Sequence, residues 1–485
     1  MSIRRDVLHS SFLAFVGQAS GLVLTFLSSV LIARGLGERE FGEFTFLISF
    51  LAVAVLLPDF GLNWILQREL SRLPEGGARV TGTAFLIRLL LFFGVVSVVN
   101  VFFYTTATDF RFLLLSNVIL MNFIFSSKVS GLRLVLESPY RAEMRLLIPV
   151  ALAVFDSALL LTVLWFVPGV TNSLENIVVW YTAANIPGFL ALLLSVQRER
   201  KIRFQPHPSE LKSLLIASSP LALYVALSSL HNSLDVFLLK WFWGSEEVGQ
   251  YGVATRLYFP FIFIPNAFII GTFPVFSKWF GDGSKRVKEA FQLGIKLMLG
   301  IAIGVMYVMV LLAHDIVHLL FKGEFQNSVV LLQILSTAQV FFFLNVFGLS
   351  FLTAINRQRR NFWIALTILV VDLVFNLIAI PTYGNEAAAL TRVAAELVGT
   401  VVLFQFTRDY VDKGFWVSFS KLVLGAFGSL AAVVILQIEQ PILGLCLAFT
   451  FFTTWCVLVR PVSRTEFDQL KSFSRSSVKM ISLKQ

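Results

Sequence analysis

Apolar runs of about twenty residues recur along almost the whole chain and are separated by short polar turns. A run of this length crosses a hydrocarbon core of about 30 Å when it is helical. Only 14% of the 485 residues are charged, whereas a soluble domain has about 25%. The alternating pattern of a membrane β-barrel is absent from the sequence. The sequence therefore predicts an all-α integral membrane protein.

The runs predict about fourteen transmembrane helices. They lie at residues 10–33, 42–66, 80–104, 110–130, 146–167, 175–196, 213–240, 249–276, 289–313, 329–354, 362–380, 385–406, 415–436 and 440–459. The loops between them are too short for an extramembrane catalytic domain. The first run is too long for the apolar region of a cleavable signal peptide, so we expect it to remain as a helix.

The net charge of +10 could indicate nucleic-acid binding, but the basic residues follow the predicted helices. If the N-terminus is cytoplasmic and the chain then alternates sides, most of the 39 Lys and Arg residues fall in cytoplasmic segments. The outer loops receive Arg34, Arg39, Arg111, Lys240 and Lys322. This asymmetry is the positive-inside pattern. It predicts cytoplasmic N- and C-termini and no nucleic-acid partner.

An internal repeat divides the sequence. Residues 37–44 and 244–251 share the pattern Gly-x-x-Glu-apolar-Gly-x-aromatic at an offset of 207 residues. Similar offsets pair Arg88 with Lys296, Asp156 with Asp372 and Pro58 with Pro265. Six helices per half is an even number, so the halves share one orientation. A parallel repeat of this kind places a substrate site between its halves, near the bilayer midplane.

The repeat predicts the domain organisation. We expect six-helix bundles at residues 1–200 and 213–410, joined by a cytoplasmic linker at residues 201–212. Two extra transmembrane helices follow at residues 411–460, and a basic cytoplasmic tail at residues 461–485 completes the chain.

Several motifs carry a family resemblance. They are Ala33-Arg34-Gly35-Leu36-Gly37, Glu40-Phe41-Gly42, Pro58-Asp59-Phe60-Gly61-Leu62, residues 235–239, residues 249–254, residues 354–357, residues 376–381 and residues 383–388. In this order and spacing, over residues 8–410, they resemble the polysaccharide and O-antigen flippases of the multidrug/oligosaccharidyl-lipid/polysaccharide exporter superfamily. One departure is Asn385-Glu386, which stands where many relatives have small residues.

The resemblance implies a V-shaped core of twelve helices, like that of multidrug exporters, which works by alternating access. It implies a bacterial or archaeal inner (cytoplasmic) membrane flippase. The implied cargo is an undecaprenyl-pyrophosphate-linked oligosaccharide for O-antigen, capsule or exopolysaccharide. Alternatives are a drug exporter or lipid II flippase of the same superfamily, or a membrane polymerase, ligase or glycosyltransferase that acts on lipid-linked glycans. The short outer loops argue against such an enzyme, and the implied partners include a polysaccharide polymerase.

Charged residues inside membrane helices are costly and commonly line a transport pathway. A pyrophosphate cargo needs cations, and the guanidinium group of arginine suits phosphate oxygens. The candidates for substrate binding in a cationic cavity are Arg88, Arg256, Lys296 and Arg392. Each also has a structural alternative: the first three can snorkel to the headgroups, and the last can be neutralised by Glu396 one turn away.

Four acidic residues are candidates for ion coupling or gating. They are Asp156, Asp372, Glu396 and Asp59. The alternative for the first two is a hydrogen-bonded contact between helices. For the last, it is capping of a helix that restarts after Pro58. We expect no cofactor, although H⁺ or Na⁺ can supply the driving force.

No other motif indicates catalysis or a resident metal. His314, Asp315 and His318 have a possible metal spacing, but a solvated interfacial face explains them better. Cys446 and Cys456 have no ligand pattern. A P-loop, a Gly-x-Ser-x-Gly motif and a His-Glu-x-x-His motif are all absent from the sequence. We therefore expect a transporter and not an enzyme.

Overall fold

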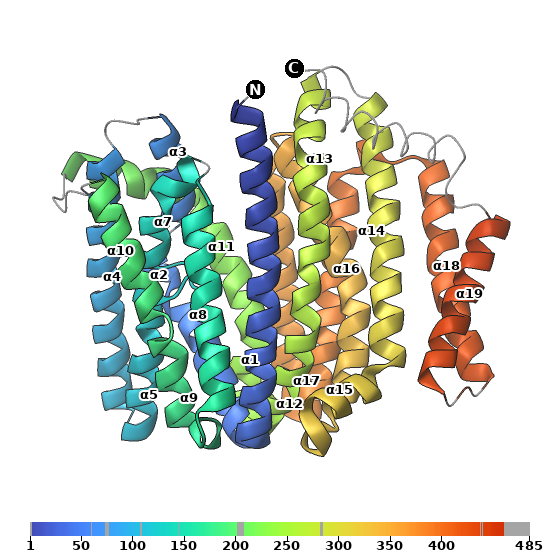
Figure 1. The fold of residues 1–485 in the computed structure, drawn as a ribbon. Helices are drawn as coiled ribbons and strands as arrows, with labels where there is room; N and C mark the ends of the chain where they lie inside the picture. The colour runs from blue at the N-terminus through green and yellow to red at the C-terminus, as the bar shows by residue number, and fades with distance from the viewer. Residues whose placement is uncertain are drawn as a thin grey trace. The chain divides into compact units, whose positions relative to one another are not determined.

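The computed structural model describes residues 2–459 except residues 60, 73–76, 107–108, 144, 201–207, 282–284, 437 and 439. All regular elements in these ranges are helices (Figure 1). The chain divides into two compact units, residues 1–252 and 253–485. The predicted tail at residues 461–485 and most of the predicted linker lie outside the described residues.

The first unit holds the helices up to the middle of α12. They are α1 (Ser2–Ala54), α2 (Leu56–Asp59), α3 (Leu62–Arg72), α4 (Gly77–Thr105), α5 (Phe110–Leu120), α6 (Asn122–Phe125), α7 (Leu132–Ala142), α8 (Leu147–Phe166), η1 (Val170–Asn172), α9 (Leu174–Ala183), α10 (Ile186–Arg200), α11 (Pro208–Phe242) and the first part of α12 (Ser245–Tyr258). Helix α1 packs against α8 and α11, and α7 packs against α3 and α4.

The second unit contains the rest of α12 and the elements that follow. They are η2 (Phe259–Ile262), α13 (Phe263–Gly281), α14 (Lys285–Leu311), α15 (Ala313–Phe321), η3 (Lys322–Phe325), α16 (Ser328–Ala354), α17 (Gln358–Phe406), η4 (Arg408–Tyr410), α18 (Lys413–Ile435) and α19 (Pro441–Val459). Helix α16 packs against α14 and α17, and α18 packs against α19.

Ten helical segments in the described ranges are long and apolar enough to cross a membrane. Two of them, Val16–Asp59 and Gln358–Phe406, have 44 and 49 residues. At about 1.5 Å per residue, each is at least twice the length of one crossing. Gly37 and Gly384 interrupt them with positive φ angles of 71° and 61°. Each long helix therefore consists of two stretches, which match two pairs of predicted spans.

The all-α membrane fold is confirmed, but some predicted spans differ from the helices. The span at residues 110–130 contains the shorter helices α5 and α6, which meet at Met121. Its last five residues, 126–130, are not helical. The loop predicted at residues 131–145 is wrong, because most of it forms α7. The many polar residues of this segment suggested a solvated loop, whereas the helix buries them against one another.

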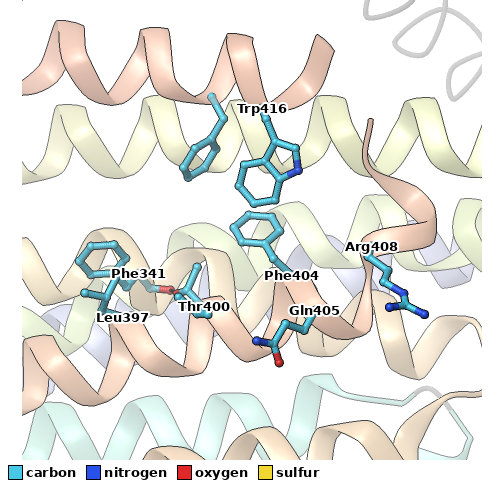
Figure 2. A pocket seen from close by; sticks show the side chains of 9 residues that line it. Phe341, Leu397, Thr400, Phe404, Gln405, Arg408 and Trp416 are labelled. Atoms are coloured by element: carbon cyan, nitrogen blue, oxygen red, sulfur yellow. Dashed lines mark hydrogen bonds between the residues drawn. The ribbon is translucent and has the colours of Figure 1, made fainter. Parts of the chain in front are cut away.

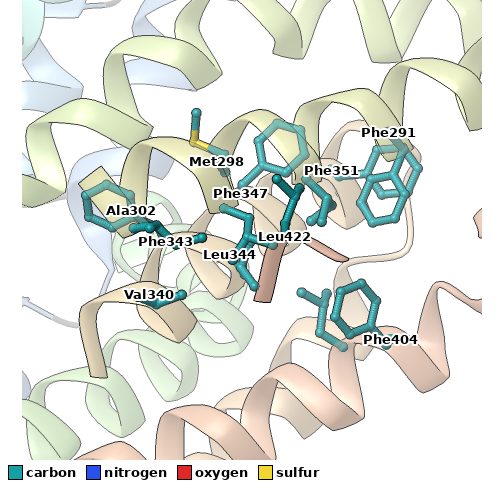
Figure 3. Packing of buried hydrophobic residues seen from close by; sticks show 14 of the residues in the cluster. Phe291, Met298, Ala302, Val340, Phe343, Leu344, Phe347, Phe351, Phe404 and Leu422 are labelled. Carbon is teal, nitrogen blue, oxygen red and sulfur yellow. The ribbon is translucent and has the colours of Figure 1, made fainter. Parts of the chain in front are cut away.

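Aromatic rings fill the core of the second unit (Figure 3). The rings of Phe291 on α14 and Phe351 on α16 stack with their centroids 4.2 Å apart. Phe347 lies on the same face, 6.2 Å from Phe291. Lipid tails are as apolar as these rings, so burial from water is not what joins the helices in a bilayer. Close van der Waals packing and the ring geometry stabilise the contact instead.

Candidate functional site

The predicted charged residues fall in both units, and all lie on helices. Arg88, Asp59 and Asp156 belong to the first unit. Arg256, Lys296, Arg392, Asp372 and Glu396 belong to the second. Most are almost completely buried, with at most 5% of the residue exposed. Arg256 in the last turn of α12 is half-buried.

The first unit joins two of the candidates in one ion pair. The guanidinium of Arg88 on α4 donates to the carboxylate of Asp59 at the end of α2. It also donates to the backbone oxygens of Asp59 at 3.0 Å and Gly131 at 2.8 Å. Because Arg88 is 0% exposed, this pair and its carbonyl partners replace water around the charge. Arg88 therefore ties α2 and α4 to the segment before α7.

A second buried network surrounds Asp156 on α8. Its carboxylate accepts from Arg133 on α7 and from the backbone N–H of Gly188 at 3.1 Å. The guanidinium Nε of Arg133 also lies 3.6 Å from Glu137 Oε1. Arg141 donates to the other oxygen of Glu137 at 2.7 Å. The four side chains form a chain of alternating charges from the core of the first unit toward its surface.

Arg133 and Glu137 are buried residues that are not among the predicted site residues. Their signal was the spacing of Arg133, Glu137 and Arg141 at successive intervals of four, which places alternating charges on one helix face. The segment lies between the predicted spans 110–130 and 146–167 and is rich in polar residues, so its composition predicts a loop. The structure instead pairs Arg133 with Glu137 on α7 and with Asp156 on α8.

Neutral polar side chains extend the same region of the first unit. Asn122 Nδ2 donates to Thr182 Oγ1 at 2.7 Å, and Asn185 Nδ2 donates to Asn122 Oδ1 at 3.3 Å. All three residues are buried. They link the short helix α6 to the break between α9 and α10. This hydrogen bonding satisfies polar groups that would otherwise be costly in the membrane.

In the second unit, Asp372 belongs to a polar cluster on the two halves of α17. Asn376 Nδ2 donates to Asp372 Oδ1 at 3.1 Å, and the Thr391 hydroxyl donates to Asn376 Oδ1. The Thr391 hydroxyl also donates to the backbone oxygen of Ala388 at 3.0 Å. The cluster therefore connects the stretches before and after the break at Gly384.

Arg392 and Glu396 lie one turn apart in the second stretch of α17 and are 2% and 3% exposed. The guanidinium carbon of Arg392 lies 6.0 Å from the ring centroid of Phe259, within range of a cation–π contact. Glu396 Oε2 accepts from Asn345 Nδ2 of α16 at 2.7 Å. Thr400 donates to Asn345 Oδ1 at 3.1 Å. The two charges therefore have partners on different elements.

The repeated motif brings α1 and α12 into backbone contact within the first unit. A Cβ on Gly42 would lie 1.7 Å from the backbone oxygen of Ser245, and one on Gly249 would lie 2.1 Å from that of Glu38. The 207-residue offset relates Gly42 to Gly249 and Glu38 to Ser245, so each of these two contacts is the equivalent of the other in the repeat. The motif's first glycines, Gly37 and Gly244, both have positive φ angles, 71° and 95°. Both copies therefore begin with a glycine in the left-handed region, and each copy contacts the backbone of the other.

The described residues contain no group of three or more His, Cys, Asp or Glu side chains that could hold a metal ion. His314 and Asp315 are exposed, with an Nδ1–Oδ1 distance of 3.7 Å. The His314 and His318 rings stack with centroids 6.0 Å apart.

Comparisons with known proteins identify the chain's family. A family model described as "Polysaccharide biosynthesis protein" matches residues 7–280, and the MatE model matches residues 220–378. The "Probable low-salt glycan biosynthesis flippase Agl15" of Haloferax volcanii is 22% identical, and the alignment covers 96% of this chain and 98% of that protein. The "Capsular polysaccharide biosynthesis protein CapF" of Staphylococcus aureus is 24% identical over 43% of this chain and 53% of that protein.

Solved structures share the fold. The lipid II flippase MurJ in an inward closed conformation matches with a TM-score of 0.72 and 13% identity, over 93% of this chain and 99% of that one. An inward-facing multidrug resistance MATE transporter matches with a TM-score of 0.66 and 16% identity, over 81% and 97%. The fold is therefore that of MATE and MurJ proteins. The matches to the MatE and polysaccharide biosynthesis models and to a flippase over almost the whole chain indicate a transporter and not an enzyme. With its family model spanning more than half of the sequence, this multi-pass membrane protein belongs to the polysaccharide biosynthesis protein family of flippases.

Proposed function

We propose that the protein moves an undecaprenyl-pyrophosphate-linked oligosaccharide from the cytoplasmic to the outer leaflet for O-antigen, capsule or exopolysaccharide synthesis. The observation that carries the proposal is the burial of cations in apolar helices of the second unit. Arg392 is 2% exposed and Lys296 is 5% exposed, although a charge at this depth costs at least about 2.5 kcal/mol. These cations have a function if an anionic cargo binds to them in place of their partners within the protein.

Within this proposal, the candidate cations have different roles. Arg256, Lys296 and Arg392 contact the pyrophosphate, which would otherwise cross the hydrocarbon core uncompensated. Arg88 holds the first unit together, because Asp59 and two carbonyl oxygens already receive its hydrogen bonds. The relatives named for glycan and capsule biosynthesis support a lipid-linked glycan as the cargo.

Alternating access driven by H⁺ or Na⁺ completes the proposal. Asp372 and Glu396 are the coupling candidates in the second unit, and Asp156 and Asp59 are those in the first. The two acids of the first unit pair with buried arginines, so a change in their protonation would loosen the contacts between helices. We place the protein in the inner (cytoplasmic) membrane with cytoplasmic termini, beside a polysaccharide polymerase that consumes the flipped glycan.

The test is a leaflet-exchange assay with the full-length protein in liposomes and a fluorescent polyprenyl-pyrophosphate oligosaccharide. Arg392→Ala and Lys296→Ala should reduce the initial rate at least tenfold, whereas Arg392→Lys should retain part of it. Arg359→Ala is the matched control, because Arg359 is exposed at the start of α17. Wild-type rates in both alanine variants would contradict the proposed cation path.

The same assay separates the alternatives. Exchange of lipid II in preference to the oligosaccharide lipid would assign the protein to peptidoglycan synthesis. Export of a cationic dye without exchange of either lipid would indicate a drug exporter, an outcome compatible with the match to the MatE model. Formation of a new glycosidic bond would indicate a polymerase or glycosyltransferase.

A further inference from the structure

A groove of about 590 Å³ lies in the second unit between α16, α17 and α18 (Figure 2). Aromatic side chains form much of its wall: Phe341, Phe404, Trp416 and Phe419. The rings of Phe404 and Trp416 meet edge to face with centroids 4.8 Å apart, and those of Phe404 and Phe419 are 5.6 Å apart. These contacts hold the rings in place, so the apolar wall of the groove is preformed.

One end of the groove is polar. Gln405 and Arg408 line this end, where α17 gives way to η4 (Figure 2). The side chain of Arg408 is 84% exposed, and its Nε lies 3.9 Å from Asp409 Oδ1. Asp409 also lies 3.8 Å from Arg357. The exposed Arg359 and Lys413 lie at the starts of α17 and α18. With Arg357 and Arg408, they outnumber the acidic Asp409 and Asp412 around this end.

The length of the groove corresponds to one leaflet. Leu397 lines the apolar end of the groove and Arg408 lines its polar end, and the two residues are eleven positions apart along the chain. At about 1.5 Å per residue, this is about 16 Å, or roughly half of a 30 Å hydrocarbon core. Leu397 and Val401 are 42% and 49% exposed, so the groove is open along its side. A single acyl chain can therefore lie in it with its headgroup beside Arg408.

We propose that this groove binds one phospholipid of the surrounding bilayer, selected for an anionic headgroup. The aromatic wall holds an acyl chain, and Arg408 and Gln405 bind the headgroup phosphate. A soluble glycan or nucleotide can stack on aromatic rings, but among the described residues only Thr400, Gln405 and Arg408 line the groove to bind its polar groups. A polyprenyl chain is longer than one leaflet and would extend beyond the wall. This lipid site is separate from the cargo path proposed above.

The test is photolabelling of the full-length protein in nanodiscs with a phosphatidylglycerol that carries a diazirine on its acyl chain. Labelled peptides should contain residues near Val401 and Trp416. Arg408→Gln should reduce labelling about fivefold, the equivalent of about 1 kcal/mol for one basic residue at a membrane surface. Val401→Trp should fill the groove and remove the label.

Arg198→Gln is the matched control, since it removes an exposed arginine of α10, which does not line the groove, and should leave labelling unchanged. Arg408 is itself exposed, so its substitution tests the proposal even where Val401→Trp fails to fold. Equal labelling by a phosphatidylcholine probe, or full labelling of Arg408→Gln, would overturn the headgroup selection. Displacement of the label by a polyprenyl pyrophosphate at lower concentration than by phosphatidylglycerol would assign the groove to the lipid carrier instead.

Discussion

Gly42 of α1 and Gly249 of α12 occupy equivalent positions in the two repeats, and each has no room for a side chain because the other repeat's backbone lies against it. Thr45 and Gly252 are also equivalent positions of the two repeats, and they contact each other directly. A Cβ on Gly252 would be 2.8 Å from Thr45 Oγ1. Small residues at a helix crossing allow such close approach in membranes. The repeated glycines are therefore explained by contact between the repeats.

Replacement of Gly42 or Gly249 by alanine should destabilise this crossing. The added methyl group meets a backbone oxygen, which cannot move aside as a flexible side chain can. Overpacking of this kind costs about 1–3 kcal/mol, so the thermal unfolding midpoint in detergent should fall in each variant. Gly94→Ala on α4 is the control, because a Cβ there meets no atom within 4 Å. It should leave the midpoint unchanged or raise it, since alanine favours helix. Equal midpoints for Gly42→Ala and Gly94→Ala would refute the crossing.

Removal of Asp59 should be more harmful than joint removal of Asp59 and Arg88. Asp59→Ala leaves the guanidinium of a fully buried arginine without its carboxylate, and breaking a buried pair in this way costs about 3–5 kcal/mol. The double variant Asp59→Ala/Arg88→Met removes both charges and should recover part of the loss. Thermal unfolding of the three proteins in the same detergent measures the difference. A double variant less stable than Asp59→Ala would show that the arginine stabilises the unit mainly through Gly131.

The fold class could be predicted from the sequence because the length and apolarity of the runs are local properties. The repeat was also visible, since Gly37 and Gly244 begin copies of one motif. The pairing of Asp59 with Arg88 could not be predicted, because it joins positions 29 residues apart on different helices. Arg133 was missed for a related reason: a polar helix whose charges neutralise one another has the composition of a loop. Which charges meet depends on packing that periodicity does not encode.

The network around Asp156 should tolerate loss of its acid better than loss of its arginine. Asp156→Asn leaves Arg133 with Glu137, 3.6 Å away. Arg133→Gln instead leaves Asp156 and Glu137 both buried, at 2% and 1% exposure, without the cation between them. The unfolding midpoint should therefore fall further in Arg133→Gln. Arg145→Gln is a surface control, because its ion pairs with Glu143 and Glu199 are half-exposed and such pairs contribute about 0–1 kcal/mol. The reverse order of the first two variants would contradict this account.

Asp412 should stabilise the start of α18 in a pH-dependent way. Its carboxylate accepts from Gln292 of α14 at 3.1 Å and from the backbone N–H of Phe415 at 2.8 Å, and Lys288 lies 3.6 Å away. These hydrogen bonds lower the pKa of Asp412 from its usual 3.8, and the bond from Gln292 has the largest effect. A lowered folded-state pKa means that the stabilisation is complete above pH 3.8 and is lost as the pH falls through the folded value. Asp412→Ala should cost about 1 kcal/mol at neutral pH, as loss of a helix cap does. The difference in unfolding midpoint between this variant and the wild type should shrink below pH 3.8.

Asp409→Ala is the control in the same turn, because its ion pairs span 3.8 and 3.9 Å at an exposed position. A difference for Asp412→Ala that stays constant down to pH 2.5 would show that the cap acts without its charge.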